Sequence, residues 1–92
     1  MTFIIEKTSE FDKWLRKLKD LRAKAKILVR IQRIELKGNF GDCKSVGEGI
    51  MELRVKTGKG YRVYYKEHDE KIILLLFGGN KSTQSEDIDK AK

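Results

Sequence analysis

The sequence contains no proline, one cysteine and one histidine in 92 residues. A lone Cys43 excludes an internal disulfide framework, and with His68 as the only imidazole the chain lacks the ligand sets of the usual zinc sites. No apolar run approaches the length of a membrane-spanning helix. The first residues lack the basic and hydrophobic regions of a secretion signal. We therefore expect a protein of the reducing cytoplasm that needs no metal or other cofactor.

Acidic residues are the scarcer charge. The chain has 21 Lys and Arg against 14 Asp and Glu, a formal net charge of +7. The cations are clustered: residues 13–37 carry ten against two acids, and residues 54–66 carry five against none. Such clusters are typical of proteins that bind a phosphate backbone, although an acidic protein partner would suit them too. For the first cluster a solvated helix face is the simpler interpretation.

The length and composition predict one α+β domain over residues 1–92. A short strand is expected over residues 2–7. A helix should follow over residues 9–18, because Thr8 or Ser9 can cap its start and its apolar residues have helical spacing.

A second helical pattern runs from Leu21 to Lys37 and stops at Gly38, a residue type common just past helix ends. Neither Gly nor Pro separates it from the first helix. One straight helix over residues 9–37 would be roughly 43 Å long, however, which is long for so small a domain. We therefore predict a helical hairpin.

After a glycine-rich loop over residues 38–49, the hydrophobic period changes from helical to two. In residues 50–56 and 61–67 apolar side chains alternate with charged ones, and the sequence "TGKG" between them predicts a turn. A second turn is expected over residues 67–71. The continuous apolar run at residues 72–77 then predicts a central strand that is covered on both faces.

The last segment, residues 84–92, reads as a short helix, for which Thr83 and Glu86 can form a capping box. The predicted order is β-α-α-β-β-β-α. An antiparallel sheet should pack its apolar face on the N-terminal helical hairpin.

The other face of this sheet should be ionic. In a hairpin of simple register, Arg54, Lys56, Arg62 and Tyr64 point away from the helices, and Lys81 lies at the end of the neighbouring strand. An ordinary solvated face is one interpretation. Like charges that face each other across strands repel, however, so the cluster should cost stability unless an anion occupies it.

Three motifs in this order, "ELR", "GYRVYY" and "GGNKSTQ..DI..A", carry a resemblance to the RelE/ParE toxin superfamily, and in particular to its HigB-like branch of addiction-module killer proteins. The similarity covers nearly the whole chain. It implies the sheet-on-hairpin fold and a type II toxin encoded beside an antitoxin, which by family analogy has a helix-turn-helix domain. Many members cut mRNA in the ribosomal A site.

The resemblance implies a catalytic set at Arg54, Lys56, Arg62 and Lys81. Metal-independent RNA cleavage needs the ribose 2′-OH deprotonated, the phosphorane charge stabilised and the 5′-oxygen protonated. The two arginines suit charge stabilisation. Lys56 is the expected base, since neighbouring cations would lower its pKa, and Lys81 is an acid or second phosphate clamp. Glu52 is an alternative base or, as we prefer, a counter-ion.

Three further residues are expected to contact RNA. Tyr64 could stack on a base, and Lys59 and Lys66 would bind phosphates. His68 is expected at the surface rather than in catalysis. No aromatic residue or histidine follows Phe77, and in this the sequence departs from several ribosome-dependent relatives, which have an aromatic or charged residue in the C-terminal segment.

Three functions compete at this point. The first is a ribosome-dependent mRNA endonuclease, whose partners are the ribosome, mRNA and an antitoxin. The second is a ParE-like toxin that acts on a protein such as DNA gyrase, and the third is a non-catalytic basic RNA-binding module. The cation cluster favours the first over the second, because an inhibitor of gyrase has no need of cations that converge on one phosphate.

Overall fold

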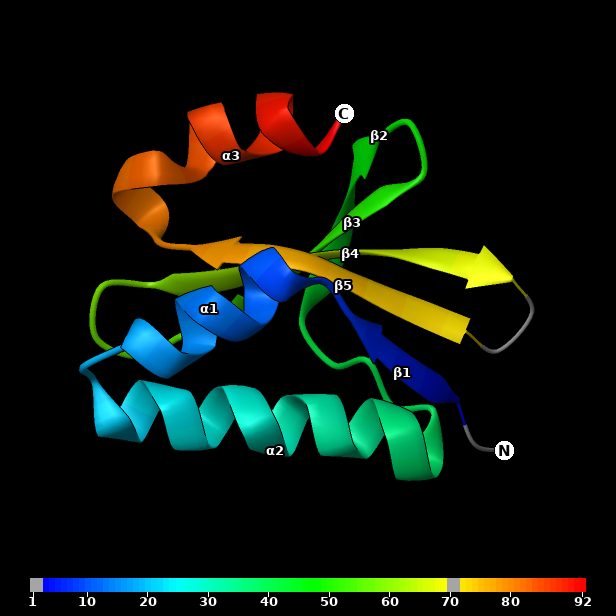
Figure 1. Cartoon of the computed structure of the whole chain (residues 1–92), viewed down its shortest axis with the longest axis horizontal. Coiled ribbons are helices and arrows are strands. Elements are labelled where there is room, and N and C mark those ends of the chain that lie inside the picture. The colour runs from blue at the N-terminus through cyan, green and yellow to red at the C-terminus, as the bar shows by residue number, and fades with distance from the viewer. Residues whose placement is uncertain (1–2, 70–71) are drawn as a thin grey trace.

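The computed structural model describes residues 3–69 and 72–92 and shows one sheet with helices on both sides (Figure 1). In chain order the elements are β1 (Ile4–Lys7), α1 (Ser9–Lys17), α2 (Leu21–Lys37), β2 (Cys43–Gly47), β3 (Ile50–Val55), β4 (Tyr61–Asp69), β5 (Ile72–Gly79), the 3₁₀ helix η1 (Lys81–Thr83) and α3 (Gln84–Ala91). The α+β class and the predicted order are confirmed, with one strand more than expected. None of the described helices is long and apolar enough to cross a membrane.

The sheet has the order β1-β5-β4-β3-β2. Its pairings are antiparallel except for β1, which lies parallel to β5, so the sheet is mixed rather than wholly antiparallel. The extra strand, β2, falls within the segment that the sequence indicated as a loop. Only Cys43 and Val46 are apolar in it, and its register with β3 shifts between Ser45 and Gly47, so no alternating pattern marks it.

The helical hairpin is confirmed, and each of its helices is capped by a side chain. The Thr8 hydroxyl accepts from the N–H of Phe11 at the start of α1. Asp20 accepts from the N–H of Ala23 at the start of α2. A new N-cap, rather than Gly or Pro, therefore separates the helices. Gly38 ends α2 with φ 64°, in the left-handed conformation that glycine adopts at little cost.

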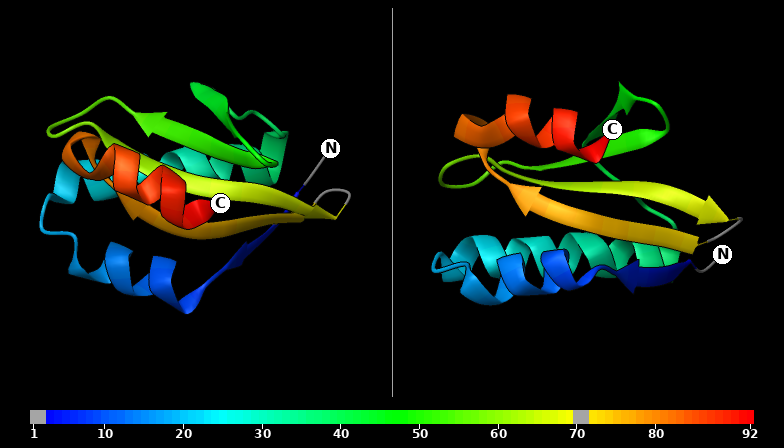
Figure 2. Two further views of the ribbon diagram at one scale, coloured as in Figure 1. Left: turned by 90° about the horizontal axis from the view of Figure 1, so that it is seen from above. Right: turned by 45° about the horizontal axis from the view of Figure 1, so that its top comes forward.

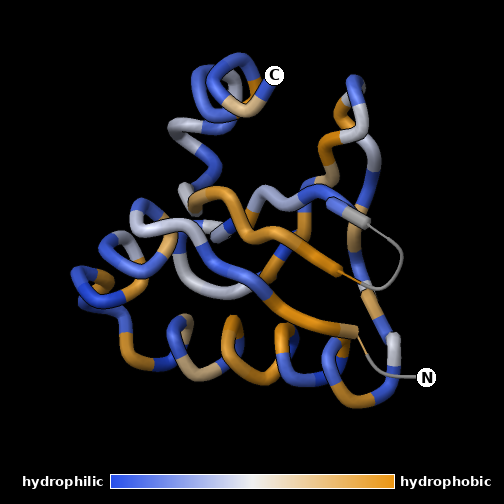
Figure 3. The backbone as a smooth tube through the Cα atoms, turned by 45° about the vertical axis from the view of Figure 1, so that its right-hand side comes forward, coloured by the Kyte–Doolittle hydropathy of each residue, from blue (hydrophilic) through white to orange (hydrophobic). Residues whose placement is uncertain are grey.

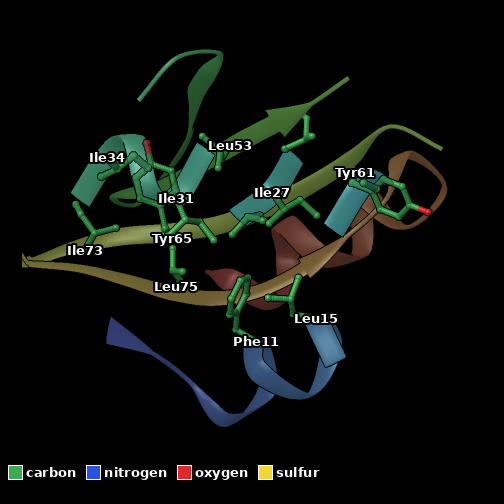
Figure 4. Packing of buried hydrophobic residues seen from close by; sticks show 13 residues of the cluster. Phe11, Leu15, Ile27, Ile31, Ile34, Leu53, Tyr61, Tyr65, Ile73 and Leu75 are labelled. Carbon is green, nitrogen blue, oxygen red and sulfur yellow. The ribbon is translucent and has the colours of Figure 1, made fainter. Parts of the chain in front are cut away.

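The main core lies between the sheet and this hairpin, as predicted (Figure 4). Its fully buried members include Phe11 from α1, Ile27 from α2 and Val63 from β4. The apolar alternation of β3 and β4 is confirmed by the burial of the side chains on this face. The ring of Trp14 covers Gly78 so closely that a Cβ there would lie 2.3 Å from it, which brings α1 directly onto β5.

The opposite face is not open, because α3 lies across it (Figure 2). Ile50, Tyr64 and Phe77 form a second buried cluster, against which Ile88 and Ala91 of α3 pack. β5 is therefore covered on both faces, as its continuous apolar run predicted.

The start of the last helix differs from the prediction. Thr83 makes no capping hydrogen bond to α3, so the predicted Thr83–Glu86 capping box is wrong. Asn80 instead caps η1 and shares a capping box with Thr83, whose hydroxyl also donates to Asp87. β4 is also longer than predicted and includes His68, which is exposed. The rest of the predicted turn, at residues 70–71, lies outside the described residues.

Candidate functional site

Two arginines face each other at the end of the β3–β4 hairpin. Arg54 on β3 pairs directly with Arg62 on β4, as the simple register predicted. Two guanidinium groups at this spacing repel unless carboxylates lie among them. The structure supplies two such carboxylates, one for each arginine.

The first carboxylate is that of Glu52, which is fully buried. Its Oε2 lies 3.6 Å from Nε of Arg62, and it accepts hydrogen bonds from the Tyr64 hydroxyl at 3.3 Å and from Nε2 of Gln84 at 2.9 Å. Arg62 is only 13% exposed and also donates through Nη1 to the carbonyl of Gly60 at 2.6 Å. Glu52 is therefore the counter-ion of Arg62, and its burial argues against the alternative role of base.

The second carboxylate is that of Asp42, which the sequence analysis missed. Nη2 of Arg54 donates to its Oδ1 at 3.0 Å, and Nζ of Lys56 lies 3.7 Å from its Oδ2. Arg30 of α2 fixes this segment by donating to the carbonyls of Phe40 at 2.9 Å and of Asp42 at 3.1 Å. The cations of residues 54–66 therefore have acidic partners from outside that segment: Glu52, the preferred counter-ion, and Asp42, which the sequence did not indicate.

Lys81 and Lys59 lie beside Arg62 at the same end of the hairpin. Gly60 lies between Arg62 and Lys81: a Cβ at this position would be 3.4 Å from Nη1 of Arg62 and 3.6 Å from Cβ of Lys81. The N–H of Lys81 also donates to the carbonyl of Lys59. Both lysines are exposed and line one surface depression with Asn80 and Ser82. The structure thus brings together four of the predicted cations, Arg54, Arg62, Lys81 and Lys59. Lys56 lies at the edge of this cluster, where it pairs with Asp42.

Two predicted RNA contacts are not part of this cluster. Tyr64 is fully buried beneath α3, with its ring 5.4 Å from that of Phe77, so it offers no face for a base to stack on. Its predicted exposure is wrong, because α3 covers this part of the ionic face. Lys66 is exposed but lies four residues along β4 from Arg62, a distance of about 13 Å.

The site contains all the unsatisfied buried polar side-chain atoms found in residues 3–69 and 72–92. These atoms are Oδ2 of Asp42, Oε1 of Glu52, Nε of Arg54 and Nε of Arg62. Buried polar groups are normally hydrogen-bonded, and an exception calls for an explanation. Nε of Arg62 lies 3.6 Å from Oε2 of Glu52, just beyond hydrogen-bond distance, and both Nε atoms are shielded from solvent. An anion such as a phosphate would therefore bind through the exposed part of Arg54 and the neighbouring lysines. Within the same described ranges, no group of three or more His, Cys, Asp and Glu is placed to hold a metal ion.

Arg30, Asp42 and Gln84 support the site, and the sequence analysis missed all three. Arg30 had a detectable signal, because it lies three residues after Ile27 and four before Ile34, on the core face of α2. Asp42 and Gln84 had none, since each reaches the site through a tertiary contact that no periodicity encodes.

The buried phenol of Tyr64 gives the site a measurable pH dependence. Burial first, and then the Glu52 carboxylate, raise its pKa above the ordinary value of 10.0. The contribution of the protonated Tyr64 phenol to the free energy of unfolding is therefore fully present below pH 10. It is lost as the pH rises from there toward the folded-state pKa, by about 1.4 kcal/mol per pH unit for one phenol. Urea unfolding at a series of pH values above 10 should show this decline. Tyr64→Phe should reduce the slope, and an unchanged slope would contradict the assignment.

Comparison with known proteins places these features in a family. Residues 13–92 match the family described as phage derived protein Gp49-like. The whole chain is 58% identical to an uncharacterized protein of Haemophilus influenzae, of which the match covers 92%.

Two solved structures have the same fold. E. coli toxin RelE, in the free state and with two arginines replaced by alanine, matches 98% of this chain and 93% of its own, with a TM-score of 0.75 and 16% identity. An archaeal RelE–RelB complex from Pyrococcus horikoshii matches 88% of this chain and 97% of its own, with a TM-score of 0.61 and 18% identity. The RelE-like fold implied by the sequence motifs is confirmed.

Proposed function

The chain belongs to the phage-derived Gp49-like family, and from this membership, its RelE-like fold and its site we propose that it is the toxin of a type II toxin–antitoxin module. We propose further that it acts in the cytoplasm and blocks translation as a ribosome-dependent, metal-independent mRNA endonuclease. Its partners are then the ribosome, mRNA and an antitoxin.

One observation carries the catalytic part of the proposal. Arg54 and Arg62 are paired residues of adjacent strands, the side chain of Arg54 is 35% exposed, and the exposed Lys81 and Lys59 lie beside Arg62. A phosphate oxygen that binds among these cations would gain charge-assisted hydrogen bonds and offset the repulsion between them. Electrostatic stabilisation of this kind is strongest where the dianionic phosphorane develops in the transition state.

The remaining roles follow from the positions of the side chains. Lys81, exposed beside Arg62, is suited to clamp the phosphate or protonate the leaving 5′-oxygen. Lys56, whose side chain is 86% exposed, remains the proposed base for the 2′-OH. Its ion-pair partner is the Asp42 carboxylate, 3.7 Å from Nζ, rather than cations alone. Asp42 and Glu52 would orient the two guanidinium groups.

The chemistry predicts the ends of the RNA fragments. Attack by the 2′-OH leaves a 2′,3′-cyclic phosphate on the upstream fragment and a 5′-hydroxyl on the downstream one. Fragments from a cell-free translation reaction should therefore resist ligation at the upstream end until a phosphatase that opens and removes the cyclic phosphate is added. A free 3′-hydroxyl would contradict the mechanism and indicate attack by water.

Growth tests distinguish the toxin from its alternatives. Expression of the chain alone in a bacterium should arrest growth, and coexpression of the antitoxin encoded beside it should relieve the arrest. If the purified protein inhibits DNA gyrase and leaves messages intact, the ParE-like alternative is correct. If it binds RNA without cutting it, the chain is a binding module.

A further inference from the structure

Arg30 is the one arginine of α2 that is half-buried, whereas Arg22 and Arg33 are exposed. Apolar and hydrophilic positions alternate along this helix (Figure 3), and Arg30 lies between the core residues Ile27 and Ile34. A cation at the edge of a core needs acceptors close by, because its burial otherwise costs free energy. The acceptors that Arg30 finds therefore indicate what it does.

The guanidinium of Arg30 bridges the glycine-rich loop and β3. Its Nη1 donates to the carbonyl of Arg54 at 2.6 Å. Its Nη2 donates to the carbonyls of Phe40 at 2.9 Å and of Asp42 at 3.1 Å. Asp42 and Arg54 are 12 residues apart in the chain, so the two ends of one side chain join separate segments. The rigid fork of a guanidinium group is suited to hold several acceptors in fixed relative positions.

The backbone closes this bridge into a ring of hydrogen bonds. The N–H of Arg54 donates at 2.9 Å to the same Asp42 carbonyl that accepts from Arg30. The side chains of these two residues then pair, with Nη2 of Arg54 donating to Oδ1 of Asp42 at 3.0 Å. Arg30 therefore fixes the backbone from which both members of the Arg54–Asp42 ion pair project.

The loop is shaped to receive this guanidinium. A Cβ at Gly41 would lie 2.9 Å from Nη2 of Arg30, and the φ of 66° there favours glycine as well. The neighbouring Phe40 ring packs against the rings of Phe3 and Tyr65, with centroids 5.3 Å and 5.8 Å away. The loop is thus anchored in the core at Phe40 and held by Arg30 at Asp42.

We propose that Arg30 is a positioning residue: through the carbonyls of Asp42 and Arg54, it holds the guanidinium of Arg54 where the reacting phosphate binds. The inference rests on the proposed RNA cleavage and adds to it a residue that does not touch the substrate. Arg54 is 35% exposed and is oriented by its pair with Asp42. A displacement of about 1 Å in a group that stabilises the transition state can lower the rate about 100-fold.

Arg30→Met tests the bridge, because it keeps the length and the apolar stem of the side chain but removes its donors. In single-turnover cleavage of a message on translating ribosomes, the maximal rate per folded protein should fall at least about tenfold. The protein concentration that gives half the maximal rate should change less than about threefold, because the donors of Arg30 are engaged with carbonyls rather than with RNA.

Arg30→Lys separates the fork from its charge. A lysine ammonium can replace one Nη group but cannot reach both the loop and the Arg54 carbonyl, so the maximal rate should still fall at least about fivefold. A wild-type rate in this variant would show that the charge is sufficient and would overturn the proposal.

The matched control is Ile31→Val, which removes one methyl group from the core at the next residue of α2. It destabilises the same helix without changing the donors to the three carbonyls. Its cleavage rate per folded protein, with the folded fraction measured by urea unfolding, should equal that of the wild type. An equal loss of rate in this control would attribute the effect to stability and overturn the positioning role.

Hydrogen exchange measured by NMR tests the inference independently of RNA cleavage. The amide of Arg54 donates to Asp42, and it should exchange at least about tenfold faster in Arg30→Met than in Ile31→Val. If exchange is faster but the wild type cuts no message, the positioning role stands and only the proposed function fails. Unchanged exchange of the Arg54 amide, or cleavage by Arg30→Met at the wild-type rate, would overturn the inference.

Discussion

Replacing Arg62 with alanine should destabilise the domain by about 3 kcal/mol, because it removes the cation beside a buried carboxylate. Glu52 is fully buried, and the guanidinium of Arg62 is the only cation within 4.0 Å of it in the described residues. The alternation of charges in the sequence suggests the opposite sign, since removal of one of several facing cations would relieve repulsion. The structure reverses that expectation by placing Glu52 among them.

A second substitution separates stability from activity. In Arg62→Ala/Glu52→Gln the buried charge is gone, so most of the lost free energy of unfolding should return. RNA cleavage should not return, because the guanidinium that we propose to stabilise the phosphorane is still missing, a loss of about 100-fold or more. Urea unfolding and single-turnover cleavage of both variants measure the two effects. A double variant that cleaves RNA as well as the wild type would show that Arg62 has only a structural role.

Val63→Asp should unfold the protein. Val63 adjoins Arg62 on β4 but points into the main core, where its exposed fraction is 0%. An unpaired carboxylate buried there should cost more than about 4 kcal/mol, a large part of the stability of a domain of this size. Circular dichroism should show loss of the folded state at 25 °C or a steeply lowered melting temperature.

The control for this change is Lys66→Asp, three residues further along the same strand. Lys66 is exposed, so the introduced carboxylate stays in water and stability should change by less than about 0.5 kcal/mol. If Val63→Asp melts close to the wild type while the strand remains intact, the described packing of β4 against the helical hairpin is wrong.

The elements that the sequence predicted correctly are those with a regular hydrophobic period. The helical spacing in α1 and α2 predicted both helices of the hairpin. The alternation in β3 and β4 predicted the register of Arg54 with Arg62. β2 was missed because residues 43–47 have no such period and pair only through an irregular register. The parallel pairing of β1 with β5 was missed because a short edge strand carries no signal of its direction.

The site was harder to predict than the fold. The cations of the hairpin and Glu52, their preferred counter-ion, follow from strand alternation, whereas Asp42 comes from a glycine-rich loop and does not. Tyr64 was misplaced because α3 covers the ionic face, a contact between residues far apart in the chain. Local periodicity determines which way a side chain points, whereas tertiary packing determines whether it is exposed.

Cleavage mapped by primer extension tests the central claim most directly, namely that the arginines of the β3–β4 hairpin stabilise the reacting phosphate. The templates are one message that ribosomes translate and the same message without its start codon, each incubated with the wild type or with Arg62→Ala/Glu52→Gln. We predict discrete cuts within the reading frame of the translated message by the wild type alone. Equal cutting of both messages would contradict ribosome dependence, and equal cutting by the folded double variant would contradict the role of Arg62.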